Sequence, residues 1–271
     1  MPASTAVTLS PRSSLALAVV TALGAFAPAR AQVRPPAHAP APLPFAIGEA
    51  LNYQVRVSRM GDVGTGRMWI EGPMLEGGVS VWRIRSEINA GKGPIRATDR
   101  TSSYFDPVRL ATVRFTKEEH HVLSNSEEDV RIDRTARRWI DEEGPSGPLG
   151  SDAPLDELSF LYVLRTLPLD RDTVIRLDRH FDAARNPTIV RIKGRDTLTT
   201  PAGLFRTRVV EMEVRDPKRY KGTGVIRIHL YEGGCHIPIR IESRMPVLGI
   251  TTLTLTGWAH SPLYPANVPC E

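Results

Sequence analysis

Residues 155–169 read LDELSFLYVLRTLPL and form the one convincing helical stretch of this 271-residue chain. Its apolar residues recur at helical spacing, at Leu155, Leu158, Leu161, Tyr162 and Leu164. This period predicts a helix with one wide apolar face. Because the rest of the chain reads as strands and turns, the only partner available to cover that face is a β-sheet.

The residues that flank this stretch predict where the helix begins and ends. Ser151 or Asp152 can act as its N-cap, and Pro154 suits a first helical turn. Pro168 cannot continue the helix and is expected to end it.

Most of the chain alternates apolar and polar residues with the period of half-buried strands. Val210, Met212 and Val214 share one face of such a strand, and Ile226, Ile228 and Leu230 share one face of another. We count about a dozen strands separated by turns that contain Gly or Pro. The fold class is therefore mainly β, with one curled antiparallel meander, barrel-like or half-barrel, packed around a single central helix.

The first 31 residues have the pattern of a secretory signal peptide. Arg12 precedes an apolar run at residues 15–26, and Ala29-Arg30-Ala31 offers a cleavage site. The apolar run is short for a membrane-spanning helix, which needs roughly 20 residues. We therefore expect export to the periplasm of a Gram-negative bacterium, or secretion, with no transmembrane span after cleavage. The alternative is an uncleaved amphipathic segment.

The expected domain organisation follows from the composition of the remaining chain. Residues 32–44 are rich in Pro and Ala and are expected to form a linker. Residues 45–260 form a single β-rich domain, and residues 261–271, with three prolines, form an irregular tail.

Charge gives little support for a nucleic-acid partner. The net charge is +5, and the arginines are scattered along strands between Asp and Glu. This pattern is typical of solvated strand faces, so we expect no nucleic acid to bind. Only 6% of residues are aromatic, which disfavours an outer-membrane barrel with aromatic girdles.

The chain has two cysteines, Cys235 and Cys270. An even number in an exported protein favours one disulfide, which would hold the C-terminal tail against the end of a strand. Two unpaired thiols remain the alternative, because spacing alone does not show that the two Cα atoms come close enough.

No motif of known chemistry is present. The sequence has no G-x-S-x-G elbow, no H-E-x-x-H and no C-x-x-C. His229, Cys235 and His236 could form a soft three-ligand metal site, but a disulfide cysteine beside turn histidines explains them better. We therefore predict no catalytic, cofactor-binding or metal residue, and no cofactor.

Four segments together resemble the bacterial domain of unknown function 3108 family. They are FAIGEALNYQVRVSRMGDVGTGRM (45–68), the helical stretch at 155–169, TPAGLFRTRVVE (200–211) and IPIRIESRMPVLGITTLTL (237–255). Their order and spacing make the resemblance, which implies an exported, mostly β protein with no established activity. The turn EGGCH at 232–236 departs from the acidic turn common in that family.

Four polar or amphipathic residues of the helix are candidate ligand-binding or structural residues: Asp156, Ser159, Tyr162 and Arg165. They lie at helical spacing and match the polar part of the family motif. We expect them to tie the helix to the sheet by hydrogen bonds. If the sheet is hollow around the helix, they are the first candidates to contact a ligand.

Two classes of function fit these observations. The first is a non-enzymatic envelope protein with a structural or assembly role, whose partner is an apolar or lipid-like ligand or another envelope protein. The second is a periplasmic hydrolase whose site has no recognisable motif, because β scaffolds host many enzymes.

Overall fold

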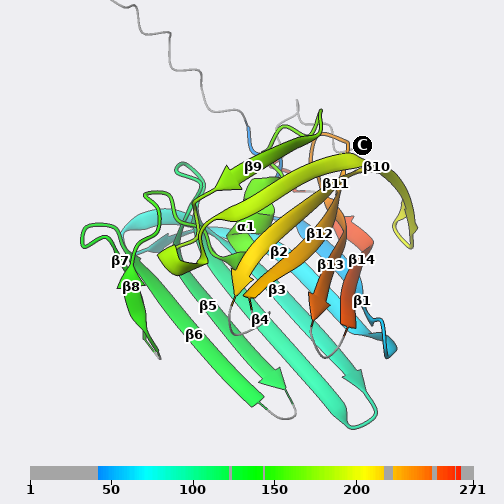
Figure 1. Cartoon of the computed structure of the whole chain (residues 1–271), viewed down its shortest axis with the longest axis horizontal. Coiled ribbons are helices and arrows are strands. Elements are labelled where there is room, and N and C mark those ends of the chain that lie inside the picture. Colours follow the sequence, from blue (N-terminus) through cyan, green and yellow to red (C-terminus); the bar gives the residue numbers. More distant parts are fainter. Residues whose placement is uncertain are drawn as a thin grey trace, which may run out of the picture. The chain divides into compact units, whose positions relative to one another are not determined.

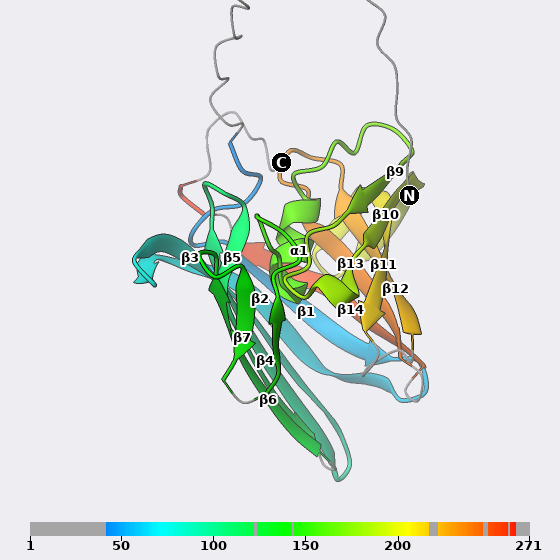
Figure 2. The ribbon, with the colours of Figure 1, turned by 60° about the vertical axis from the view of Figure 1, so that its left-hand side comes forward.

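Two antiparallel meanders, joined side by side, make a single 14-stranded sheet in the computed structural model. The structure describes residues 42–121, 124–142, 144–216, 222–245, 249–259 and 261–263, all of which belong to one compact unit. The predicted fold class is confirmed, since the chain is mainly β and the one α-helix of the described residues lies inside the curled sheet (Figures 1 and 2).

The strands follow the chain order within each meander. The first contains β1 (Ala50–Val57), β2 (Gly61–Glu76), β3 (Val79–Lys92), β4 (Ile95–Asp106), β5 (Ala111–His121), β6 (Ser124–Asp133), β7 (Arg138–Asp141) and β8 (Ser146–Pro148). The second contains β9 (Thr173–Leu177), β10 (Thr188–Thr200), β11 (Gly203–Asp216), β12 (Gly222–Tyr231), β13 (Pro238–Met245) and β14 (Gly249–Ala259). Helix α1 (Glu157–Leu164) lies between the two meanders in the chain, and the short 3-10 helix η1 (Ala183–Arg185) lies within the second meander, between β9 and β10.

The two meanders are joined where β1 pairs with β14, with Leu51 opposite Trp258 and Val55 opposite Leu253. The beginning and the end of the domain therefore lie at the centre of the sheet. Its two edges, β8 and β9, come from the middle of the chain, on either side of α1.

The two edge strands do not pair with each other, so the described sheet remains open. Irregular backbone partly bridges the gap instead. Leu149 forms an isolated bridge with Asp182, and Leu155 forms another with His180. The amide of Gly150 also donates to the carbonyl of Phe181 over 2.8 Å. This bridged seam holds the segment before α1 against the segment after β9.

The helix is buried on every side, which differs from the single apolar face predicted from the sequence. All residues from Leu158 to Leu164 are buried, and they join one core with side chains of both meanders, such as Tyr53, Val210 and Leu255. A helix that is apolar all round belongs in a core. No described helix has the length and apolarity needed to span a membrane.

The predicted ends of the helix are corrected by the structure. The N-cap is Asp156, not Ser151 or Asp152, because Leu155 is still held in its extended bridge to His180. The helix ends at Leu164, ahead of Pro168. After it, Thr166 and Leu167 continue with tighter bonds to the carbonyls three residues earlier.

The bridged seam gives a first prediction. A Cβ added at Gly150 would lie 2.5 Å from Asn186 Nδ2 and 2.6 Å from the carbonyl oxygen of His180. Gly150→Ala should therefore push the seam apart and lower the free energy of unfolding by about 1–3 kcal/mol in urea denaturation. The control is Gly194→Ala, whose Cβ would meet nothing within 4 Å. Equal stability of the two variants would show that the seam tolerates displacement.

Candidate functional site

Asp156 anchors the N-terminal end of α1 to the first meander. Its carboxylate accepts hydrogen bonds from the backbone amides of Leu158 and Ser159, at 2.8 and 2.9 Å. It also accepts from Ser103 Oγ of β4 at 2.5 Å and from Thr112 Oγ1 of β5 at 2.6 Å. One fully buried carboxylate thus caps the helix and attaches it to two strands.

The same cluster includes Ser159, whose hydroxyl accepts from the backbone amide of Asp156 over 2.9 Å and lies 2.9 Å from Thr112 Oγ1. These bonds complete a capping box. Burial raises the pKa of Asp156 above its ordinary value, although the accepted hydrogen bonds oppose the rise.

Arg165 anchors the C-terminal end of α1. It is fully buried, and its guanidinium makes two hydrogen bonds with the carboxylate of Glu49, at 2.6 and 2.7 Å. It also donates to the carbonyl oxygens of Pro44 at 2.7 Å and Cys235 at 2.9 and 3.1 Å. Arg165 therefore joins the helix to the chain before β1 and to the turn before β13.

Tyr162 lies beside this ion pair and is also buried. Its ring packs edge-on against Phe45 at a centroid distance of 5.2 Å, and the Arg165 guanidinium lies 5.2 Å from it. Asp156, Ser159, Tyr162 and Arg165 are thus placed inside the core, where they hold the helix. None of the four lines the small cleft beside the first turn of α1, which is described below. A ligand-binding role for them remains a prediction.

Cys235 is buried in the turn before β13, and its carbonyl oxygen is the acceptor for Arg165. Cys270 lies outside the described residues, so the disulfide between them remains a prediction. The neighbouring His236 contacts the carbonyl oxygen of Arg165 through Nδ1 at 2.6 Å, and burial lowers its pKa. The turn is therefore fixed to the end of the helix from two sides.

A small cleft of about 60 Å³ opens beside the first turn of α1. Its walls come from five parts of the chain: α1, the loop between β9 and β10, the first residue of β10, β11 and β12. The lining residues are Glu157, Phe160, His180, Arg185, Thr188, Met212, Val214, Arg215, Asp216 and Ile226. An apolar wall from β11, β12 and Phe160 thus faces a charged rim.

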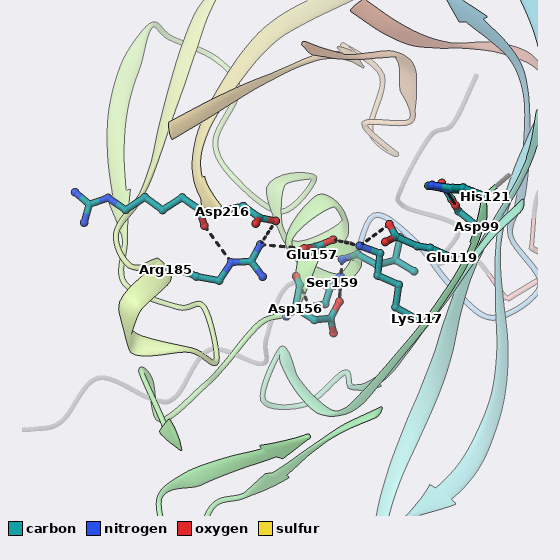
Figure 3. A network of polar contacts seen from close by, with 11 residues as sticks. Asp99, Lys117, Glu119, His121, Asp156, Glu157, Ser159, Arg185 and Asp216 are labelled. Carbon is teal, nitrogen blue, oxygen red and sulfur yellow. Dashed lines mark hydrogen bonds and ion pairs between the residues drawn. The ribbon is translucent and has the colours of Figure 1, made fainter. Parts of the chain in front are cut away.

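The rim belongs to a row of alternating charges that crosses the interior of the sheet (Figure 3). Arg185 contacts Glu157 at 2.9 Å and Asp216 at 3.2 Å. Glu157 also contacts Lys117 at 3.4 Å, and Lys117 contacts Glu119 at 3.0 Å. Glu157 stands in the first turn of α1, where the positive end of the helix dipole favours a carboxylate.

His180 is one of two almost fully buried polar side chains that line the cleft, with 5% of its surface exposed against 3% for Thr188. Its Nδ1 accepts a hydrogen bond from the backbone amide of Asp182 at 3.0 Å. Its Nε2 is buried without a hydrogen-bond partner in the described part of the chain. Burial lowers the pKa of His180 to about 3, so the ring is neutral at physiological pH.

The described residues contain no group of three or more His, Cys, Asp and Glu side chains that could hold a metal ion. One histidine contacts a carboxylate in the manner of a hydrolase base, since His121 Nε2 lies 2.7 Å from Asp99 Oδ1. The described hydrogen bonds of His121 include no serine or cysteine that could serve as its nucleophile.

Sequence reasoning identified apolar residues of the cleft wall but not its polar residues. The strand period had placed Met212 and Ile226 on apolar faces, and the register now shows them directly opposite each other. No sequence signal indicated His180 or Arg185, because both lie in a loop that only the seam brings to α1.

Comparison with known proteins gives a family. The model of a protein family of unknown function, DUF3108, matches residues 52–256. The chain belongs to the DUF3108 family. The resemblance drawn from four sequence segments is thereby confirmed. Membership in DUF3108 assigns no activity, and no curated protein shows a significant match.

A solved structure outside the DUF3108 family has a similar fold. The crystal structure of a beta-barrel-like protein of the domain of unknown function DUF1849, from Brucella abortus, aligns with a TM-score of 0.55 and 10% identity. The alignment covers 80% of this chain and 99% of that chain, and shows a shared fold alone. A putative exported protein with a YmcC-like fold from Bacteroides fragilis aligns over 81% of this chain and 99% of that chain at 12% identity. Its TM-score of 0.29 gives no support for a shared fold.

The Arg165 anchor gives a second prediction. Arg165→Met leaves the Glu49 carboxylate buried without its cation, which should cost about 3–5 kcal/mol of unfolding free energy in urea denaturation. The control is Arg176→Met, which removes an ion pair with Asp178 whose side chains are 62% and 52% exposed. The control should change stability by less than about 1 kcal/mol. A similar loss in both variants would rule out a special role for the buried pair.

The buried cap gives a third prediction, about pH. Since the pKa of Asp156 is raised in the folded state, its unfolded form ionises first as pH rises above about 4. The stability that Asp156 contributes is therefore complete in acid and falls as pH rises through the folded pKa. Asp156→Asn should lose less stability relative to wild type at pH 7 than at pH 4, measured by urea denaturation.

Asp178→Asn, which removes an exposed acid, reports the effect of net charge in the same experiment. A loss for Asp156→Asn that grows from pH 4 to pH 7 would mean that the hydrogen bonds outweigh burial.

Proposed function

We propose that this DUF3108 member is an exported, non-enzymatic protein that binds an apolar, lipid-like ligand on the concave side of its sheet. Export is supported by the signal-like N-terminal sequence, and the periplasm of a Gram-negative bacterium is the compartment we propose. The observation behind ligand binding is an inward-facing apolar wall that the core does not fully cover.

This wall begins in the cleft and continues along the second meander. Met212 of β11 lies opposite Ile226 of β12, and Ile228 lies opposite Ile241 of β13, so these residues share the concave face. Val214, Ile226 and Ile241 pack against the core but are only partly buried. Apolar surface that stays partly wet inside a curved sheet gains about 25 cal/mol per Å² when a ligand covers it.

Most of the interior around α1 is filled, because residues 158–164 are all buried. The cleft of about 60 Å³ is too small for an acyl chain, so such a ligand requires a wider opening. The β9–β10 loop, which contains η1, can provide it. Arg185 ties this loop to Glu157 and Asp216 through ion pairs whose side chains are 13–28% exposed, so a wider opening requires these pairs to separate.

A hydrolase is the weaker proposal. The His121–Asp99 contact is partly exposed and lies outside the residues that line the cleft. Because this contact lies apart from the cleft, the geometry of the cleft supports binding better than acyl transfer.

The proposal predicts that the two faces of β12 respond differently to charge. Ile226→Glu places a carboxylate in the apolar wall and should weaken binding of the uncharged fluorescent probe N-phenyl-1-naphthylamine by about tenfold or more. The control is Val225→Glu on the opposite face of the same strand, where Val225 is 43% exposed. Probe fluorescence titrations measure both, and thermal unfolding checks that both variants are folded.

Native mass spectrometry of the wild-type protein, extracted without detergent, provides the second measurement. A co-purified lipid mass supports the proposal. Absence of both a lipid mass and saturable probe binding would overturn it and leave a structural or assembly role.

A further inference from the structure

The cleft has features that select one kind of lipid. Resting on the proposed function, we propose that the ligand is an acyl-ester lipid with a zwitterionic head, and that His180 Nε2 donates a hydrogen bond to its ester carbonyl. The argument combines the tautomer of one buried ring with the charges at the rim.

The tautomer of His180 is set by its backbone contact. Its Nδ1 accepts the amide proton of Asp182, so the single proton of the neutral ring must lie on Nε2. The ring is buried, and this N–H has no acceptor in the described part of the chain. An unpaired buried donor is destabilising, and buried polar groups are usually hydrogen-bonded. A ligand acceptor at this position would satisfy it.

The side chains around His180 do not provide that acceptor. The ring of Phe160 stacks on it at a centroid distance of 6.5 Å and an interplanar angle of 24°. Met212 and Ile226 line the same cleft. In such apolar surroundings an uncharged carbonyl oxygen is a suitable partner, because a charged acceptor would lose its hydration on entering.

The rim determines which head the lipid can have. Two carboxylates, Glu157 and Asp216, and two guanidinium groups, Arg185 and Arg215, line the cleft. Both carboxylates contact Arg185 (Figure 3). Equal numbers of positive and negative groups favour a head with no net charge over an anionic head. A zwitterion suits the alternation, because its ammonium can lie near Glu157 and Asp216 while its phosphate lies near Arg185.

The exposed fractions of the lining residues separate a charged rim from a buried polar group. The side chains of Arg185 and Glu157 are 19% and 28% exposed, so the head would lie at the rim. His180, which is more buried, would meet the ester group. Ile226 and Val214, which are only partly buried, would then contact the chains. His180 and Arg185 belong to one loop, so the head and the ester would contact the same segment of the chain.

The test uses three soluble probes with short chains of equal length: the diacyl phosphatidylethanolamine, the diacyl phosphatidylglycerol and the ether-linked phosphatidylethanolamine, which has no carbonyl. Isothermal titration of the wild-type protein should give the tightest binding for the diacyl phosphatidylethanolamine. Both the anionic lipid and the ether lipid should bind about tenfold more weakly.

His180→Asn retains an oxygen that can accept from the Asp182 amide but lacks the Nε2 donor. It should weaken binding of the diacyl phosphatidylethanolamine about tenfold and leave the ether lipid unchanged. His180→Gln, which can place an amide N–H near the Nε2 position, should restore part of the loss. His120→Ala, on an exposed part of β5, is the control and should bind all three probes as the wild type does.

Equal binding of the ester and ether lipids, or an equal effect of His180→Asn on both, would overturn the role of His180. Equal binding of the ethanolamine and glycerol lipids would overturn the zwitterionic head. Either result can occur while N-phenyl-1-naphthylamine still binds, in which case the proposed function stands. If neither that probe nor any lipid binds, both the proposed function and this inference are wrong.

Discussion

The buried ion pair between Arg165 and Glu49 is the interaction on which the rest of the structure depends. A helix enclosed by a sheet has no water to satisfy its last carbonyls and charged side chains, so the protein must supply partners. Arg165 receives a carboxylate and two backbone carbonyls, from Pro44 and Cys235. These groups belong to the start and the end of the domain, so one guanidinium fixes the helix and both meanders together.

At the N-terminal end of the helix, neutral hydrogen-bond donors satisfy the buried carboxylate. Asp156 collects hydrogen bonds from the helix amides and from Ser103 and Thr112 of the first meander. With both ends held, the helix packs into one core with side chains of both meanders. The sheet closes only partly, through the bridges of Leu149 and Leu155 to the loop after β9.

This incomplete closure produces the cleft. If β8 and β9 were paired, the loop with His180 and Arg185 would have no place between α1 and the second meander. Because the edges are bridged by irregular backbone, charged side chains of the loop meet the apolar wall of β11 and β12. The cleft therefore combines a loop with the strands of a sheet, an arrangement common in binding sites.

The sequence by itself determined the family, the β class and the central helix, because period-2 strands and one period-3.6 stretch are local patterns. It also singled out Asp156 and Arg165, without showing that they would be buried anchors. Only the tertiary structure decided the N-cap, the all-round burial of the helix and the cleft. Those features depend on pairing between residues far apart in the chain, such as Leu155 with His180, and local periodicity contains no information about such pairing.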